Sequence, residues 1–400
     1  MRTRLGTVLA ALVTSATAAA VLPSGTPASA VTPVGAGVAA AAQTAPTAAR
    51  ATPRLRISVR ARGLSHAWDA KPIGRGRVLI TEREPARLTV AAGSGTRRVR
   101  FPTGKVFVSG ETGLMGLEID PGYSSNRRFY TCSGWRTGGG GHDVRVIAWR
   151  MNDAATRARM IKPLVTGLPS TSGRHGGCRL LVTDGGALVV GTGDAAVGRN
   201  PRSLTSLGGK TLRLQLPSGR PHPANPFAGA SNRKKRYVLT YGHRNVQGLA
   251  QRRDGSLWSV EHGPDRDDEV NRLRPGGDYG WHPVPGYDES VPMTDQSLPG
   301  KQVGARWRSG RPTLATSGST FVDGRKWGAW NGVLAVAALK AERLVLMRFD
   351  RQGRFVRSWA PRQLRRYGRL RTVTQLPNGN LLVCTDGDGG AGKVLLVKPV

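Results

Sequence analysis

The segment DGGALVVGTGD, residues 184–194, decides the fold, because its pattern recurs five more times along the chain. Each copy has a turn with Gly, Asn or Asp, then a short apolar strand, then small or polar residues. The other copies are GRGRVLITER (74–83), NRRFYTCSGW (126–135), DGSLWSVEHG (254–263), NGVLAVAALK (331–340) and NGNLLVCTDG (378–387). Six small sheets cannot each bury both faces alone, but they can when stacked radially. The repeat predicts an all-β fold, a six-bladed β-propeller of four-stranded antiparallel sheets over 55–400.

Composition agrees with many short strands. Of 400 residues, 54 are Gly and 26 are Pro, which argues against a helical bundle. Hydrophobic residues make up 38% of the chain, which is enough for a packed interior and excludes wholesale disorder. Two packed sandwiches are the alternative fold, but they would not explain a unit that recurs through the whole of 55–400.

The N-terminal region predicts export. Two cations in MRTR (1–4) precede a mostly apolar run over 5–22, and small residues follow up to residue 30. This order is typical of a secretory signal peptide over 1–30, with a membrane anchor as the alternative. Residues 31–54 are mostly Ala, Thr, Pro and Gly, which indicates a flexible linker. No later stretch approaches the roughly 20 apolar residues of a membrane helix, so we expect a soluble, secreted protein without a membrane span.

Charge and cysteine content restrict the partners. Lys and Arg number 60 and Asp and Glu 25, a formal net charge of +35 at pH 7. The densest basic cluster, Arg233–Arg236, lacks interleaved aromatics or zinc-finger spacing, so no specific nucleic-acid binding is expected. The cationic surface would attract polyanions nonspecifically. Three cysteines, Cys132, Cys178 and Cys384, allow any one disulfide and leave at least one thiol free.

Chemically active residues recur at the same position of the repeat, at the end of the apolar strand. They are Asp194, His262, Lys340 and the pair Thr385–Asp386, at the third, fourth, fifth and sixth copies. In a radially symmetric fold, equal phase means equal height around one axis. The sequence therefore predicts that these polar groups converge on one mouth of the propeller.

Two glycine-rich segments carry candidate catalytic residues. In SGRHGGCRL (172–180), His175 lies beside two glycines, and imidazole suits proton abstraction near neutral pH. The alternative is a loop histidine without a role. GHRNVQG (242–248) places Arg244 and Asn245 just after an apolar strand, where clustered donors suit an anionic or carbonyl ligand. A hydrogen-bonded turn is the alternative there.

Two charged segments suggest ligands. In EHGPDRDDE (261–269), the cluster of Asp265, Asp267, Asp268 and Glu269 favours a hard cation such as Ca²⁺, although the helix-loop-helix spacing is absent and a solvated acidic turn is the alternative. In GRLRTV (368–373), Arg369 and Arg371 would share one face of a strand. Such cations favour a bridging carboxylate ligand, which Lys340 could join, and accidental pairing is the alternative.

Together and in this order, these segments resemble the soluble quinoprotein sugar dehydrogenases, the glucose/sorbosone and aldose sugar dehydrogenase group. The resemblance runs from about Gly63 to the C-terminus, and the order of the segments makes it specific. The segments that carry it are GLSHAWD (63–69), ITER (80–83), ETGLMGLEIDPGY (111–123), NRRFY (126–130), SGRHGGCRL, LGGKTLRL (207–214), NPF (225–227), GHRNVQG, EHGP (261–264), DDEV (267–270), DYGW (278–281), GRLRTV and LLVCTDG (381–387).

The resemblance implies a propeller that binds pyrroloquinoline quinone (PQQ) and Ca²⁺ over its axis. It implies His175 as general base, Asp194 as the carboxylate that orients it, and Arg244 as the group that polarises the quinone carbonyl. The other implied cofactor contacts are Glu111, Asn245, His262, Thr313, Lys340, Arg369, Arg371 and Thr385. The implied calcium ligands are backbone oxygens of Gly263 and Pro264, with Glu269 and the Tyr279 backbone at a second, structural site. A tricarboxylate cofactor independently calls for fixed cations.

Four positions depart from the family pattern. Val246 replaces the usual Pro, Glu111 replaces a Gln of several members, and His262 follows the aldose branch. Arg311 stands where many members carry a Trp that stacks on cofactor or substrate, so substrate range and affinity could differ. The loops between blades look shorter than in glucose-specific members, which suggests an open mouth and broad aldose tolerance.

These observations predict an exported quinoprotein that oxidises aldose sugars at carbon 1 to lactones and passes electrons to an external acceptor. Two other functions stay open. A calcium-dependent propeller lactonase would use the acidic segment and need no quinone. A non-catalytic propeller would bind carbohydrate or polyanions through its cationic surface.

Overall fold

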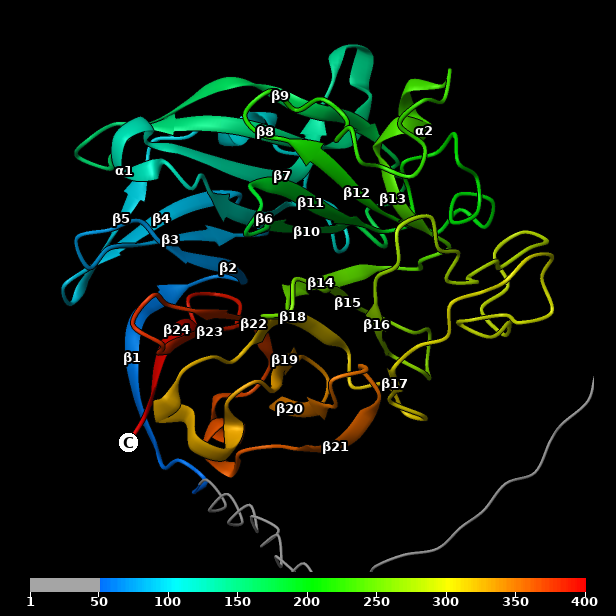
Figure 1. Ribbon diagram of the computed structural model, residues 1–400. Helices are drawn as coiled ribbons and strands as arrows, with labels where there is room; N and C mark the ends of the chain where they lie inside the picture. Colours follow the sequence, from blue (N-terminus) through cyan, green and yellow to red (C-terminus); the bar gives the residue numbers. More distant parts are fainter. Residues whose placement is uncertain (1–50) are drawn as a thin grey trace, which may run out of the picture. The chain divides into compact units, whose positions relative to one another are not determined.

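Six four-stranded antiparallel sheets build the domain that the computed structural model describes, residues 51–400 (Figure 1). The all-β, six-bladed prediction is confirmed, whereas the predicted signal at 1–30 and the linker up to residue 50 lie outside the described residues. The blades are β2 (Ala67–Pro72), β3 (Val78–Glu82), β4 (Arg87–Ala92), β5 (Gly95–Val99); β6 (Leu114–Ile119), β7 (Arg128–Arg136), β8 (His142–Met151), β9 (Ala158–Leu168); β10 (Gly177–Val182), β11 (Ala187–Thr192), β12 (Lys210–Gln215), β13 (Val238–Tyr241); β14 (Val246–Gln251), β15 (Leu257–Glu261), β16 (Glu269–Arg272), β17 (Trp307–Arg308); β18 (Thr316–Phe321), β19 (Leu334–Ala338), β20 (Arg343–Phe349), β21 (Phe355–Trp359); and β22 (Leu370–Gln375), β23 (Leu381–Thr385), β24 (Gly392–Pro399) with β1 (Leu55–Leu64).

The last blade closes the ring by combining both ends of the domain. Strand β1 pairs antiparallel with β24, from Leu55 opposite Pro399 to Leu64 opposite Gly392. In Figure 1 the blue β1 accordingly lies beside the red β24. Because the first strand completes the last sheet, the blades form a continuous ring.

Each repeated segment forms the second strand of its blade, namely β3, β7, β11, β15, β19 and β23. These strands are apolar because neighbouring blades cover both faces, and all six residues of β11 are buried. Two of the turns that lead into them contain Gly255 and Gly379, whose φ angles of +80° and +85° favour glycine. The local pattern of turn and apolar run therefore marks the same strand in every blade.

The innermost strands β2, β6, β10, β14, β18 and β22 share an irregularity. Each shows a register shift against its second strand, near the end where the innermost strand begins. Examples are the shifts between Gly177 and Arg179 and between Leu370 and Thr372. Such bulges re-aim side chains at the rim of a sheet.

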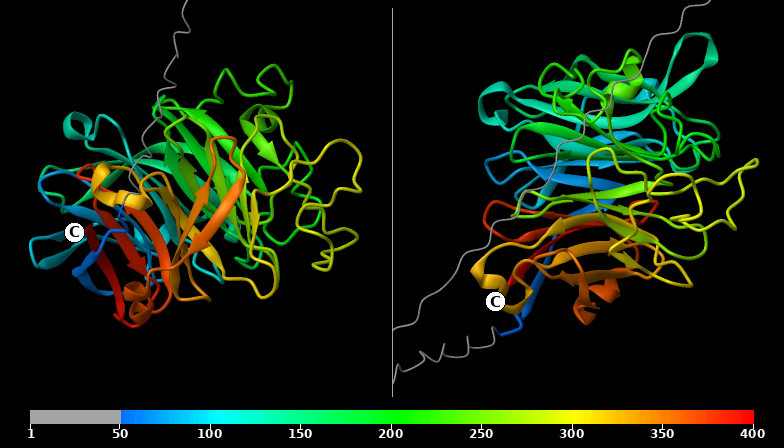
Figure 2. Two further views of the ribbon diagram at one scale, coloured as in Figure 1. Left: turned by 60° about the horizontal axis from the view of Figure 1, so that its bottom comes forward. Right: turned by 45° about the vertical axis from the view of Figure 1, so that its right-hand side comes forward.

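The remaining elements are short. Helices α1 (Tyr123–Asn126) and α2 (Arg233–Tyr237) lie outside the sheets, and no helix among residues 51–400 has the length and apolarity needed to cross a bilayer. A disulfide joins Cys132 of β7 to Cys178 of β10, while Cys384 is free and buried. The longest connection, residues 273–306 between β16 and β17, is drawn in yellow in Figures 1 and 2 and extends away from the sheets.

Candidate active site

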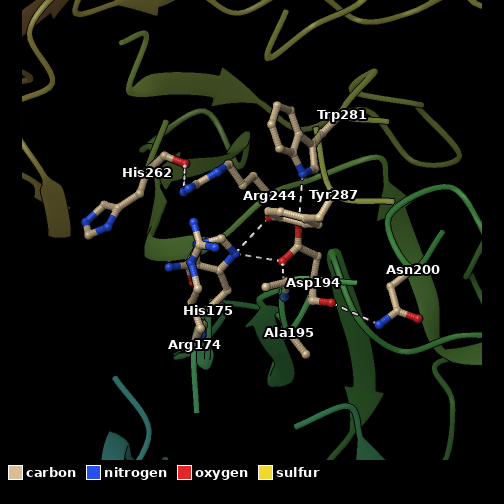
Figure 3. Close-up of polar contacts among 12 residues, drawn as sticks. Arg174, His175, Asp194, Ala195, Asn200, Arg244, His262, Trp281 and Tyr287 are labelled. Atoms are coloured by element: carbon tan, nitrogen blue, oxygen red, sulfur yellow. Dashed lines mark hydrogen bonds and ion pairs between the residues drawn. The ribbon is translucent and has the colours of Figure 1, made fainter. Parts of the chain in front are cut away.

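The predicted site residues gather at one end of the sheets, where innermost strands begin and second strands end. His175 and Arg244 lie two residues before β10 and β14, and Asp194 and His262 follow β11 and β15. Figure 3 shows His175, Asp194 and Arg244 close together, while His262 faces Arg244 with its carbonyl oxygen. His175 and Asp194 come from one blade, and Arg244 and His262 from the next. Residues at the same position of the repeat thus lie at one rim of the propeller.

His175 and Asp194 form a buried pair. The distance from His175 Nδ1 to Asp194 Oδ1 is 2.8 Å, and the two side chains are 2% and 0% exposed. The approach needs glycine, because a Cβ on Gly193 would lie 1.8 Å from the His175 carbonyl oxygen. If Nδ1 carries the proton donated to Asp194, His175 Nε2 is left free to accept another proton.

Two residues that sequence reasoning missed complete the surroundings of Asp194. Trp281 Nε1 donates to Asp194 Oδ2 at 2.8 Å, and the Tyr287 hydroxyl donates to the same oxygen at 2.7 Å. The backbone N–H of Ala196 donates to Oδ1 at 2.8 Å. Trp281 belongs to the DYGW segment, but Tyr287 carries no signal beyond a Pro-Gly turn before it.

Arg244 and Asn245 are held by carboxylates. Arg244 Nη1 donates to the His262 carbonyl oxygen at 3.1 Å, and its Nη2 contacts Glu289 Oε1. Asn245 Nδ2 donates to Glu111 Oε2 at 3.1 Å. Glu289 comes from the 273–306 connection and was not predicted. Through this connection, Tyr287 and Glu289 contact Asp194 and Arg244.

The late basic residues meet a carboxylate of the chain itself. Arg371 Nη2 donates to Asp386 Oδ2 at 2.9 Å, and Arg369 Nη2 lies 3.7 Å from the same oxygen. His66 Nδ1 lies 3.1 Å from Asp386 Oδ1. The two arginines thus share a face, as the i, i+2 spacing predicted, and Asp386 supplies a bridging anion. Arg371 is buried and Arg369 is exposed.

Three other predicted contacts have different surroundings. Lys340 is exposed beyond β19, and within residues 51–400 its ammonium forms no ion pair. Thr313 is buried, and its N–H donates to the Asp265 carbonyl oxygen at 3.1 Å. The Thr385 hydroxyl, also buried, accepts the N–H of Lys393 at 2.9 Å.

The rim is strongly cationic inside. Burial and the charges of Arg371, Arg244 and His175 lower the pKa of His262 to about 3. Burial and the charge of Arg371 also lower the pKa of Arg83. Four of the buried side-chain nitrogen atoms without a hydrogen-bond partner in the described residues 51–400 belong to this rim: Nε of Arg83, Arg244 and Arg371, and Nε2 of His262. Unpaired donors on the three buried guanidinium groups are costly, so the rim suits a ligand with several anionic oxygens.

Asp265, Asp267, Asp268 and Glu269 of the acidic segment do not gather around one point in the structure. Asp265 pairs with Arg266 and Arg311 at the surface, and Asp268 accepts backbone N–H groups of Gly263, Leu314 and Thr316. Among residues 51–400, no three His, Cys, Asp or Glu side chains lie close enough together to hold a metal ion.

Glu269 nevertheless faces another carboxylate. Asn271 Nδ2 lies 2.7 Å from Glu261 Oε1 and 3.3 Å from Glu269 Oε2. Burial and the charge of Glu261 raise the pKa of Glu269 to about 8. The Tyr279 ring stacks on His243 at 4.5 Å between centroids, and the Tyr279 hydroxyl donates to the Arg272 carbonyl oxygen.

Comparison with known proteins assigns the family. A family model described as glucose/sorbosone dehydrogenase matches residues 64–397. The chain belongs to the glucose/sorbosone dehydrogenase family. Aldose sugar dehydrogenase YliI of Escherichia coli K12 is 27% identical over 84% of this chain and 91% of its own length.

Two solved structures of family members resemble the propeller. The PQQ-bound aldose sugar dehydrogenase of Streptomyces coelicolor is 26% identical, with a TM-score of 0.72 over 87% of this chain and 99% of its own. The apo form of the soluble Escherichia coli aldose sugar dehydrogenase is 27% identical, with a TM-score of 0.75 over 87% of this chain and 100% of its own.

Two residues that depart from the family pattern, Val246 and Arg311, have different surroundings. Val246 is buried at the start of β14, where its side chain would be 2.4 Å from a Cβ on Gly191. Arg311 is 67% exposed and pairs with Asp265 at 2.6 Å, outside the buried cationic rim. Val246 thus packs between two blades, while Arg311 pairs with Asp265 at the surface.

Proposed function

We propose that this glucose/sorbosone dehydrogenase family member is an oxidoreductase that uses PQQ to oxidise aldoses at carbon 1 to lactones. The observation that carries the proposal is the buried His175–Asp194 pair beside a rim of unpartnered cationic nitrogens. The family match and the PQQ-bound relative support the choice of cofactor.

The residues present fit a tricarboxylate quinone. Arg371, Arg369 and Lys340 would hold its carboxylates, and Arg244 with Asn245 would face a quinone oxygen. The remaining cofactor contacts would be Glu111, His262, Thr313 and Thr385. When bound, PQQ supplies a hydride acceptor for carbon 1 of the sugar.

His175 has the proton-transfer role in this proposal. Its Nε2 would take the proton of the sugar hydroxyl, and the Asp194 carboxylate would stabilise the imidazolium that forms. Arg244 would stabilise negative charge that develops beside it. Burial of the pair excludes water from the transferred proton.

Calcium is the second proposed cofactor. The carbonyl oxygens of Gly263 and Pro264 lie directly after His262 at the rim, and such neutral oxygens are usual Ca²⁺ ligands. At the proposed structural site, Glu269 faces Glu261 and Asn271 Oδ1 has no partner within residues 51–400. The Tyr279 backbone would add an oxygen there. Chelation with EGTA is expected to lower both activity and melting temperature, and Ca²⁺ alone should restore the melting temperature.

Reconstitution tests the function. Purified protein loaded with PQQ and Ca²⁺ is expected to reduce a dye when aldoses are added. His175→Ala should abolish turnover but leave PQQ binding within about threefold, whereas Arg371→Ala and Arg369→Ala should weaken PQQ binding. Arg354→Ala, an exposed arginine paired only with Asp350 in the described chain, is the matched control.

Two results would contradict the proposal. Hydrolysis of lactones in the absence of quinone would favour the lactonase alternative. Salt-sensitive binding of a polyanion, without any quinone uptake or turnover, would favour the non-catalytic propeller.

The proposed enzyme is exported and passes its electrons to an external acceptor. The Cys132–Cys178 disulfide fits an oxidising compartment, which agrees with the signal peptide predicted over 1–30. Secretion would be tested by N-terminal sequencing of protein recovered from the culture medium.

A further inference from the structure

Part of the 273–306 connection lies against the rim. This part, residues 283–290, is called the tip here. The tip packs on the loop after β11, because a Cβ on Gly198 would lie 2.3 Å from the Gly286 carbonyl oxygen. Arg174 contacts it twice, with its guanidinium over the Tyr287 ring at 5.4 Å and its Nη2 2.6 Å from Glu289 Oε2. The tip is therefore held by two segments, the loop after β11 and the His175 loop that contains Arg174.

Tyr287 reaches the proton-transfer pair directly. Its hydroxyl lies 2.7 Å from Asp194 Oδ2 and 3.0 Å from His175 Nδ1 (Figure 3). Burial and the charge of Asp194 raise the pKa of Tyr287, so the hydroxyl remains a donor. Asp194 thus receives two donors on each oxygen: His175 and Ala196 on Oδ1, and Trp281 and Tyr287 on Oδ2.

We propose that Tyr287 is a positioning residue for His175, acting through the oxygen of Asp194 that His175 does not use. With Oδ2 saturated by two donors, the carboxylate cannot rotate without breaking hydrogen bonds, and Oδ1 stays aimed at His175 Nδ1. The Tyr287 donor also withdraws negative charge from Asp194, which limits how strongly the carboxylate stabilises the imidazolium. This inference rests on the proposed function.

Several charged and titratable groups surround His175, and all of them bear on its protonation. They are Glu111, Arg174, Asp194, Arg244, His262 and Tyr287. Among these, Tyr287 is the neutral donor that bonds Asp194 and also lies beside the ring nitrogen.

Tyr287→Phe removes the hydroxyl and keeps the ring. In reconstituted enzyme, kcat is expected to fall about tenfold, while KM for the sugar and the Kd for PQQ change less than twofold. Loss of one donor leaves more negative charge on Asp194, so the acid limb of the kcat/KM profile should move to higher pH. Tyr237→Phe removes a buried hydroxyl that bonds the Gly219 carbonyl oxygen far from the rim, and serves as the matched control.

A measurement without cofactor separates this inference from the proposed function. In ¹⁵N NMR of the metal-loaded protein, the His175 ring, assigned with His175→Gln, should titrate at higher pH in Tyr287→Phe than in the wild type or Tyr237→Phe. If that shift occurs but dye reduction fails in the wild type, the positioning role stands and the dehydrogenase proposal falls. An unchanged titration together with an unchanged acid limb would overturn the role of Tyr287.

Discussion

Lys210, a residue outside the reacting groups, supports the loop that holds Asp194. Its ammonium is fully buried and donates to the carbonyl oxygens of Asn200, Pro201 and Gly208 at 2.7–2.8 Å. Asn200 Nδ2 in turn donates to the Asp194 carbonyl oxygen at 2.9 Å. Burial lowers the pKa of Lys210 to about 7, but three carbonyl acceptors match the three donors of the charged form.

Lys210→Met is expected to lower the free energy of unfolding by about 3 kcal/mol, because three buried carbonyls lose their donor. Urea denaturation measures the loss. Lys162→Met is the control, since the Lys162 ammonium donates to the Ser218 carbonyl oxygen at an exposed position and should cost under about 0.5 kcal/mol. Equal stability of both variants would contradict the supporting role.

Asp386 makes the folded state sensitive to acid. Burial alone would raise its pKa, but Arg371 and the hydrogen bond from His66 lower the pKa of Asp386 to about 2. The folded carboxylate therefore stays ionised where the unfolded one, with an ordinary pKa near 3.8, becomes protonated. Its stabilisation is complete above about pH 4 and is lost as pH falls through 2.

Between pH 4 and pH 2, we expect this carboxylate to account for about 2 kcal/mol of lost stability. Asp386→Asn should be less stable at pH 6 and should lose less on acidification, as measured by thermal melting across that range. The exposed Asp388→Asn should follow the wild-type curve. Parallel curves for Asp386→Asn and the wild type would rule out the effect.

At the scale of elements, the disulfide ties two neighbouring blades beside the His175 loop. It joins β7 to β10, and Cys178 lies three residues after His175. Cross-links of this kind typically contribute about 2–4 kcal/mol. The combined change Cys132→Ala and Cys178→Ala should lower stability by that amount and abolish the effect of reductant on guanidinium denaturation. A wild-type transition that reductant leaves unchanged would contradict this contribution.

The sequence predicted the second strands but not the innermost ones in detail. The turn and apolar run are local signals, so the six segments could be recognised without knowing their neighbours. The register shifts near Cys178, Gln247 and Arg371 share no residue type, so no local pattern marks them. Convergence on one rim was predictable from equal phase, whereas Tyr287 reaches the site through packing of its loop on Gly198, a contact distant in sequence.

At the scale of the whole molecule, one ion pair on the propeller axis connects most blades. Arg179 Nη1 of β10 lies 2.8 Å from Asp69 Oδ2 of β2 and 3.2 Å from Thr372 Oγ1 of β22. Arg179 Nε donates to the Gln247 carbonyl oxygen of β14 at 2.7 Å, and the Leu117 N–H of β6 donates to Asp69 Oδ2 at 3.3 Å. Five innermost strands therefore meet at two side chains.

This arrangement predicts a large cost for breaking the pair and a small cost for replacing it. Asp69→Asn should destabilise the protein by about 3–5 kcal/mol, because the Arg179 charge stays buried without its counter-ion. Changing both residues together, Asp69→Leu with Arg179→Met, should recover much of that loss. A double-mutant cycle by urea denaturation measures the coupling. The exposed Arg127–Asp153 pair is the control, and Asp153→Asn should cost under about 0.5 kcal/mol. If Asp69→Asn behaves like this control, the ring is held by apolar contacts between blades and the axial pair contributes nothing to its closure.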